Sequence, residues 1–218
     1  RASNGVSRSS WPAAEESIRP TILYRSNNGY DFGSWAVGLH RFPELAMREH
    51  VLLLNDSIVG PFGPLDKLLG HFEKSTADVW GAAASLQFKP HLQSFMLGFR
   101  RGTLSKYPLN KFWNSVGDFG DKERVIAEYE LGLPDLLDSE LLTVDAFFRG
   151  GIMNDQALNP SLDQWERMLD RGFPFVKRQL LSNSYPPELQ VRVLEVLQKR
   201  YAVDPASWVE HVETSGAS

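Results

Sequence analysis

The chain has 218 residues, of which 42% are hydrophobic and 23% charged, a composition typical of a globular protein with one substantial core. Its formal net charge of −4 and its lack of a basic block argue against nucleic-acid binding, and the absence of cysteine excludes disulfides, thiolate nucleophiles and cysteine-based zinc sites. No apolar run approaches the roughly 20 residues that span a bilayer, which favours a cytoplasmic protein, either free or held peripherally at the inner face of a membrane.

The first half of the chain alternates between strand-like and helix-like patterns. Thr21–Tyr24 is a short β-type run that ends in turn residues, and the apolar positions of residues 31–39 then recur at helical spacing. Val51–Leu54 is an unbroken aliphatic run, which is typical of a strand buried on both faces, and it stops at Asn55-Asp56-Ser57. Because a strand, a helix and a buried strand follow one another, the sequence predicts a right-handed βαβ unit with a parallel sheet.

The second half continues this alternation and then becomes helical. Helical periodicity recurs over residues 65–73, 110–116, 122–133 and 162–169 and after Pro186-Pro187, and strand-like runs cover 77–82 and 95–99. The sequence therefore predicts an α/β fold, with a mostly parallel, Rossmann-like sheet flanked by helices. We expect this domain to cover residues 1–181 and a helical extension to cover residues 182–218.

Asp56 is the first candidate functional residue. A carboxylate at the carboxyl end of a buried strand lies where open α/β sheets bind their ligands. Aspartate beside asparagine and serine is also a good turn residue, so this stretch alone favours a turn cap.

Several short motifs follow one another in an order that resembles the rhamnan synthesis protein F family of glycosyltransferases. They span about Tyr24 to Leu181, most of the chain. In chain order the motifs are Arg25–Gly33 (RSNNGYDFG), Leu54–Ser57 (LNDS), Asp78–Gly81 (DVWG), His91–Phe95 (HLQSF), Phe112-Trp113, Tyr129–Leu133 (YELGL), Asn159-Pro160 with Trp165, and Gly172–Lys177 (GFPFVK).

The resemblance implies a GT-A-like domain that transfers a sugar, with inversion, from a nucleotide-sugar to an acceptor hydroxyl. It implies rhamnose as the sugar, dTDP-rhamnose as the donor, and a cell-surface polysaccharide or lipid-linked glycan as the acceptor. Family members carry further sequence before the Asn-Gly-Tyr-Asp segment that supplies the first strands of the nucleotide site. The chain is therefore expected to hold an N-terminally incomplete domain that is inactive alone.

Glycosyl transfer requires stabilisation of the leaving diphosphate and removal of a proton from the acceptor hydroxyl. The resemblance gives the first role to Asp56, either directly or through Mg²⁺ or Mn²⁺, since such cations are held by one or two carboxylates plus phosphate oxygens. The usual Asp-x-Asp pair is replaced here by Asn55-Asp56-Ser57, which leaves one carboxylate.

The resemblance gives the role of general base to Glu130, in the Tyr-Glu-Leu-Gly motif. The alternative is a solvated helix glutamate. If Glu130 is the base, its carboxylate must lie at the same edge of the sheet as Asp56, with Tyr129 and Leu133 packed inward to orient it.

The remaining donor-binding candidates are Asn28, Gly29, Asp31, His91 and Gln93. The first three lie at a strand-to-helix turn, where free backbone N–H groups can receive ligand oxygens, although Asp31 could instead be the helix N-cap. His91 and Gln93 precede an apolar run and could contact sugar hydroxyls, whereas a lone histidine in a loop is more often structural.

A second function class is a non-catalytic carbohydrate-binding or scaffold domain that keeps the fold and has lost the donor site. The single carboxylate at Asp56 favours it, and the Asn-Gly-Tyr-Asp and Tyr-Glu-Leu-Gly motifs favour the transferase. A phosphatase or nuclease would need a denser cluster of carboxylates or histidines than the 5 scattered histidines provide.

Overall fold

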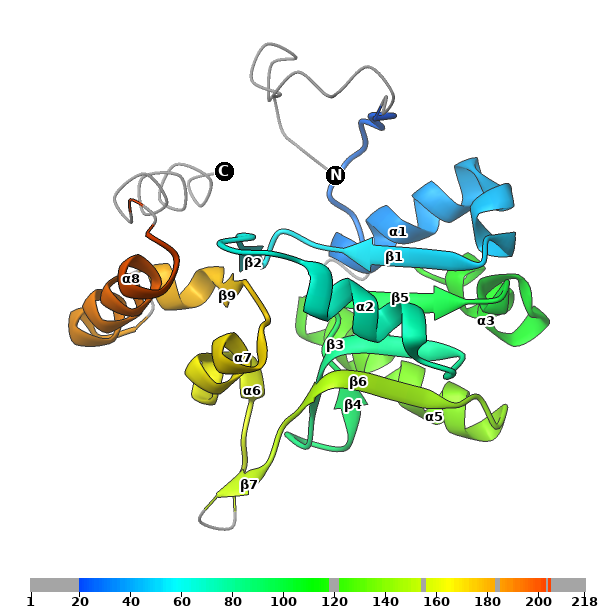
Figure 1. The fold of residues 1–218 in the computed structure, drawn as a ribbon. Helices are drawn as coiled ribbons and strands as arrows, with labels where there is room; N and C mark the ends of the chain where they lie inside the picture. Colours follow the sequence, from blue (N-terminus) through cyan, green and yellow to red (C-terminus); the bar gives the residue numbers. More distant parts are fainter. Residues whose placement is uncertain (1–19, 118–121, 154–155, 183–184, 203, 205–218) are drawn as a thin grey trace.

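The structure is a computed structural model that describes residues 20–117, 122–153, 156–182, 185–202 and 204. In this part of the chain a five-stranded sheet carries helices on both faces, and a smaller, mostly helical portion lies beside one edge of it (Figure 1). None of the described helices is long and apolar enough to cross a membrane.

The main sheet has the order β1 (His50–Leu54), β5 (Met96–Arg100), β3 (Val79–Ser85), and the short β4 (His91–Leu92) continues along the same side of β3 as β5. β6 (Val144–Arg149) pairs with β3 in parallel, and the other pairings are antiparallel. Because β5 alone separates β1 from β3, the strands β1, β3 and β6 run in the same direction. Their carboxyl ends therefore lie at one edge of the sheet, called the carboxyl edge below.

Three expectations about the sheet are wrong. Residues 20–27, which include the predicted strand Thr21–Tyr24, have no regular secondary structure, so the predicted βαβ unit is absent. The sheet is mixed rather than mostly parallel in its pairing, because the chain reverses between β3 and β4 and continues into β5, which places an antiparallel strand between β1 and β3. The α/β class itself is confirmed, as are the strands predicted at Val51–Leu54 and 77–82. The expected burial of Val51–Leu54 on both faces is wrong, because β1 is at the end of the sheet, with Leu53 buried and Leu54 exposed.

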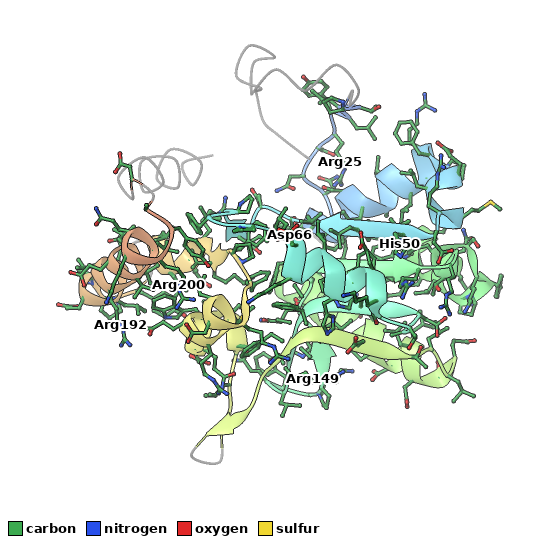
Figure 2. All side chains as sticks on the ribbon, in the orientation of Figure 1. Arg25, His50, Asp66, Arg149, Arg192 and Arg200 are labelled. Atoms are coloured by element: carbon green, nitrogen blue, oxygen red, sulfur yellow. The ribbon has the colours of Figure 1, made fainter. Side chains whose placement is uncertain are left out.

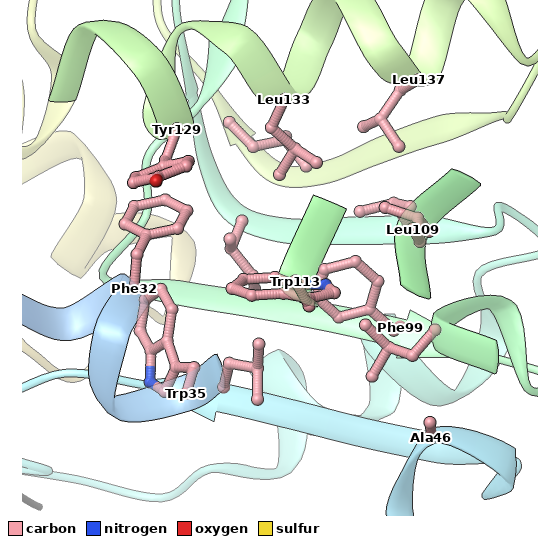
Figure 3. Packing of buried hydrophobic residues seen from close by; sticks show 14 of the residues in the cluster. Phe32, Trp35, Ala46, Phe99, Leu109, Trp113, Tyr129, Leu133 and Leu137 are labelled. Carbon is pink, nitrogen blue, oxygen red and sulfur yellow. The ribbon is translucent and has the colours of Figure 1, made fainter. Parts of the chain in front are cut away.

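One face of the sheet is covered by α1 (Tyr30–Arg41), α3 (Tyr107–Asn114), α4 (Lys122–Val125), the π-helical turn η4 (Ile126–Glu130) and α5 (Gly132–Ser139). Its centre is aromatic (Figure 3): the Phe32 ring lies 5.8 Å from that of Trp113 and 5.6 Å from that of Tyr129, stacked on both. The helix predicted over 122–133 is divided because Gly132 and Pro134 suit the first turn of a new helix better than the interior of an old one.

The other face is covered by α2 (Asp66–Lys74) and α7 (Trp165–Arg171), whose Leu68, Phe72 and Met168 pack against Trp80 and other strand residues. Short 3₁₀ helices, η2 (Pro43–Met47) and η3 (Thr103–Ser105), lie at the amino end of β1 and after β5. A small hairpin of β7 (Ile152–Met153) and β8 (Gln156–Ala157) follows β6.

The C-terminal portion is joined to the carboxyl edge by a second, two-stranded sheet. β2 (Ile58–Val59), which follows β1 closely, pairs antiparallel with β9 (Val176–Lys177). Around it, α6 (Pro160–Asp163), α7, η5 (Arg178–Leu181) and α8 (Pro187–Tyr201) enclose a third apolar cluster that includes Leu180, Val193 and Leu197. The helix expected after Pro186-Pro187 is thus present, and residues 205–218 lie outside the described part.

Asp78 joins the starts of β3 and β6. Its Oδ2 accepts hydrogen bonds from Thr143 N at 3.0 Å and Thr143 Oγ1 at 2.8 Å, and its Oδ1 pairs with Lys106 Nζ at 3.1 Å. Burial alone would raise the pKa of Asp78, but the hydrogen bonds from Thr143 and the charge of Lys106 outweigh it and hold the pKa below the usual 3.8.

The variant Asp78→Asn should lower the free energy of unfolding by about 1–2 kcal/mol at neutral pH, because it removes charge-assisted hydrogen bonds. The pKa of Asp78 is lower in the folded than in the unfolded state, so this stabilisation is present above 3.8 and is lost as the pH falls through the folded pKa. Urea unfolding of both proteins across this range measures it. Asp135→Asn, which breaks the surface pair with Lys89, is the control and should change stability by less than about 0.5 kcal/mol. A loss at Asp78 that persists unchanged in acid would contradict the assignment.

Candidate functional site at the carboxyl edge of the sheet

The turn that follows β1 is held by a continuous chain of four polar side chains, called the polar chain below. Lys177 Nζ donates to Ser57 Oγ at 3.0 Å, and Ser57 Oγ donates to Asn55 Oδ1 at 2.6 Å. Asn55 Nδ2 in turn donates to Asp31 Oδ2 at 2.9 Å. The polar chain therefore begins at an ammonium group and ends at a carboxylate, with every donor facing an acceptor.

The polar chain brings three distant segments together. Asp31 lies in the first turn of α1, Asn55 and Ser57 in the turn after β1, and Lys177 in β9. Trp35 Nε1, one turn further along α1, donates to Leu54 O at 3.0 Å and ties the same helix to the end of β1. The turn after β1 is thus attached to α1 on one side and to β9 on the other.

Asp56 lies two residues beyond the end of β1, as expected, and it is exposed. Its Oδ2 accepts from Arg178 Nη1 at 3.3 Å, with 54% of the Asp56 side chain and 33% of the Arg178 side chain accessible to solvent. The backbone of Arg178 is also fixed here, because its N–H donates to Ser57 O at 2.8 Å. A pair this exposed contributes little stability and exchanges readily with other partners.

Glu130 reaches the same edge from the helical face. Its Oε1 accepts from the backbone N–H of Ser94 at 2.9 Å, and the next residue, Phe95, accepts from Asn55 N at 3.2 Å. Tyr129 and Leu133 are buried at 5% and 3% exposure, so the expected inward packing on either side of the half-buried Glu130 is confirmed. Tyr129 Oη also accepts from Gly117 N at 2.8 Å, which holds the turn of η4 in place.

The loop before α1 is organised by Arg25 (Figure 2). Its guanidinium donates to the carbonyl oxygens of Asn28 and Tyr30 and, at 2.9 Å, to Ser34 Oγ. Gly29, with a φ of 71° in the left-handed region, is the residue that caps α1. The alternative of Asp31 as N-cap is therefore wrong: Asp31 lies within the first turn and accepts from Asn55 instead.

His91 lies in β4 and Gln93 in the link from β4 to β5, just before the partner of Glu130. His91 Nδ1 donates to Lys89 O at 2.8 Å, which is a local turn contact. Gln93 is buried at 5% exposure, and its Nε2 donates to Asn159 Oδ1 at 2.8 Å. Its Oε1 is buried without a hydrogen-bond partner among the described residues. Gln93 is thus held inside the structure beside the site, and Asn28 is exposed at the start of α1.

The groups around Asp56 differ from a carboxylate pair that holds a divalent cation. No cluster of three or more histidine, cysteine or acidic side chains suited to a metal occurs in the described ranges. The Asp56 carboxylate has a guanidinium as its partner, and both remaining side chains of the Asn55-Asp56-Ser57 turn are engaged in the polar chain. A cation there would face Arg178, so these residues do not fit a protein-held metal ion, and Mg²⁺ or Mn²⁺ at Asp56 stays a prediction.

Sequence reasoning missed Lys177 and Arg178, which contribute the positive charge of the site. Lys177 is the last residue of the Gly172–Lys177 motif. It donates to Ser57, 120 positions away in the sequence, and nothing in the neighbouring sequence indicates this contact. The one available signal is that two adjacent basic residues follow directly on a run of buried apolar ones, Phe173–Val176.

The variant Asn55→Asp should destabilise the protein at neutral pH by about 1–3 kcal/mol, because it replaces a donor by a second carboxylate against Asp31. Two facing carboxylates raise the pKa of the pair above its unfolded value, so the folded state binds an extra proton and the loss should shrink as the pH falls towards about 4. Thermal melts across this range test it. Asn114→Asp, at an exposed asparagine that donates to Asn110, is the matched control. Equal losses of stability in both variants would show that the polar chain stabilises the protein no more than an exposed surface hydrogen bond.

Comparison with known proteins agrees with the motifs quoted above. Virulence protein VirA of Vibrio anguillarum is 29% identical over 210 residues, which cover 81% of this chain and 67% of VirA. An uncharacterized protein of Sinorhizobium fredii, y4gN, is 26% identical over 117 residues, which cover 51% of this chain and 30% of y4gN. No solved structure matches the chain significantly. The sequence model of rhamnan synthesis protein F matches residues 6–216, nearly the whole chain. The chain therefore belongs to the rhamnan synthesis protein F family, whose name associates it with polysaccharide synthesis.

Proposed function

We propose that the protein is a GT-A-like, inverting glycosyltransferase that moves a sugar from a nucleotide-sugar to a growing cell-surface polysaccharide or lipid-linked glycan. Rhamnose, carried by dTDP-rhamnose, is the proposed sugar. Family membership supports the association with polysaccharide synthesis. The observation that carries the proposal is that Glu130, from the helical face, binds Ser94 N–H, next to Phe95, whose carbonyl accepts from Asn55 in the turn after β1.

The geometry gives Glu130 what a general base needs. One carboxylate oxygen, Oε1, is oriented by the Ser94 N–H at 2.9 Å, and the residues on both sides of Glu130 in the motif pack into the core. The other oxygen has no hydrogen bond to any described residue, so it is available to an acceptor hydroxyl. A base held by backbone and packing loses little orientation freedom when the substrate binds.

The reaction forms a bond between the acceptor oxygen and the anomeric carbon and breaks the bond between that carbon and the donor phosphate. The proton of the acceptor hydroxyl passes to Glu130, and the electron pair of the broken bond leaves with the nucleoside diphosphate. In an inverting transfer the base and the leaving group lie on opposite faces of the sugar. Contact between Glu130 and Asp56 would leave no room for that sugar, and the structure shows each with a different partner.

The variant Glu130→Gln should lower turnover by roughly 10²–10⁴-fold while donor affinity stays nearly unchanged, because it keeps the shape and removes the basicity. The measurement is nucleoside diphosphate release by the purified full-length protein from dTDP-rhamnose and from other nucleotide-sugars, with rhamnose-containing oligosaccharides as acceptors.

Glu128→Gln is the matched control, since Glu128 is exposed on the same turn η4. It should behave as wild type. Equal turnover of all three proteins would remove Glu130 from catalysis. A folded wild-type chain that binds such oligosaccharides without binding or turning over any nucleotide-sugar would establish the carbohydrate-binding alternative instead.

A further inference from the structure

We propose that Lys177 and Arg178 bind the phosphate groups of the sugar donor, and that Asp56 positions Arg178 instead of holding a metal ion. This inference rests on the proposed transferase function. It assigns stabilisation of the leaving diphosphate to two side-chain cations, whereas the resemblance assigns that role to Asp56 with Mg²⁺ or Mn²⁺.

The backbone fixes both cations beside the turn after β1. In the β2–β9 pairing Lys177 is the register partner of Ile58, and the N–H of Arg178 donates to Ser57 O at 2.8 Å. Lys177 therefore lies in a paired strand, opposite Ile58, and Arg178 follows it as the first residue of η5, bonded to Ser57. Positions anchored in this way hold a ligand more accurately than positions in a free loop.

Lys177 contacts an aromatic ring and a hydroxyl group at this edge. Its Nζ lies 4.9 Å from the ring centre of Phe95 and 3.0 Å from Ser57 Oγ. Phe95 is only 1% exposed, so the ring is a rigid support that attracts the ammonium and displaces water from one side of it. An ammonium carries three donors, and these two contacts orient the side chain.

Arg178 is suited to exchange one anionic partner for another. It donates to Asp56 through Nη1 at the long distance of 3.3 Å, at an exposed position. A guanidinium has five N–H donors in a planar fork that matches two phosphate oxygens. A phosphate dianion therefore competes well for Arg178, and Asp56 holds the side chain near the required position until the donor arrives.

The local charge balance favours this assignment over a metal ion. A divalent cation on Asp56 Oδ2 would lie next to the guanidinium that already contacts that oxygen, and like charges repel. A diphosphate brings the opposite sign to Lys177 and Arg178. As the bond between sugar and phosphate breaks, its electron pair moves to the phosphate oxygen, and these two cations stabilise the charge that develops there.

The test is calorimetric titration of the full chain with dTDP, UDP, GDP and inorganic pyrophosphate, in EDTA and again with Mg²⁺. Wild-type protein should bind at least one nucleoside diphosphate in EDTA. Lys177→Met and Arg178→Met should each weaken that binding by about tenfold to a hundredfold, the usual worth of a hydrogen bond to a charged group. Arg178→Lys should recover part of the loss.

Two controls sharpen the comparison. Lys199→Met removes an exposed lysine of α8 and should leave affinity unchanged. Asp56→Asn keeps the size of the side chain and should weaken binding less than either cation variant, because Asp56 acts only through Arg178. Circular dichroism melts verify that each variant is folded. If Lys177→Met does not fold, Lys177→Gln and the two Arg178 variants carry the test.

The outcomes separate this inference from the proposed function. Nucleotide binding or sugar transfer that is unaffected by the Lys177 and Arg178 variants overturns the inference alone. Binding that requires Mg²⁺ and is abolished by Asp56→Asn also overturns it and assigns a metal to Asp56. A wild-type chain that binds none of the four probes and transfers no sugar overturns both.

Discussion

The site depends on the polar chain that runs from Lys177 through Ser57 and Asn55 to Asp31. Each link alone is an ordinary hydrogen bond, worth about 1 kcal/mol to stability. Together they connect the first turn of α1, the end of β1 and the strand β9, so that an exposed turn is held as firmly as a core element. The ammonium at one end and the carboxylate at the other polarise the two neutral groups between them, which strengthens each bond.

The two halves of the site come from opposite faces of the sheet. Glu130 is presented by η4, which packs on the aromatic cluster of Phe32, Trp113 and Tyr129 (Figure 3). Lys177 is presented by β9, next to the apolar cluster that contains Phe95. The sheet edge separates a carboxylate from a cation, and this separation suits a reaction in which a proton leaves on one side and a phosphate on the other.

Much of this arrangement follows from local sequence, and the remainder does not. Val51–Leu54 is a predictable strand because it is an unbroken aliphatic run, but its place at the end of the sheet, with Leu54 exposed, could not be predicted from that run. The inward packing of Tyr129 and Leu133 follows from helical spacing in the same way. Thr21–Tyr24 has strand-forming residues but pairs with no strand of the described residues, and β propensity alone does not create a pairing.

Neither the strand β6 nor the cations of the site could be predicted from local sequence, for different reasons. β6 contains buried Phe147 and Phe148 in succession, beside the polar Asp145, so it shows neither alternation nor an uninterrupted apolar run. Lys177 and Arg178 are brought to the site only by the pairing of β9 with β2. The two strands are far apart in the sequence, so local patterns do not predict this pairing. The order of the motifs identified the family, and the three-dimensional structure was needed to show which charges face one another.

The β2–β9 pairing also has a consequence for how the protein folds. It closes a loop of more than a hundred residues, and the entropy of such a closure has to be overcome before its contacts contribute. Long-range pairings of this kind form late and slow the search for the native state. Lys177 and Arg178 therefore reach the turn after β1 late in folding, so the proposed donor site is incomplete in a partly folded or newly synthesised chain.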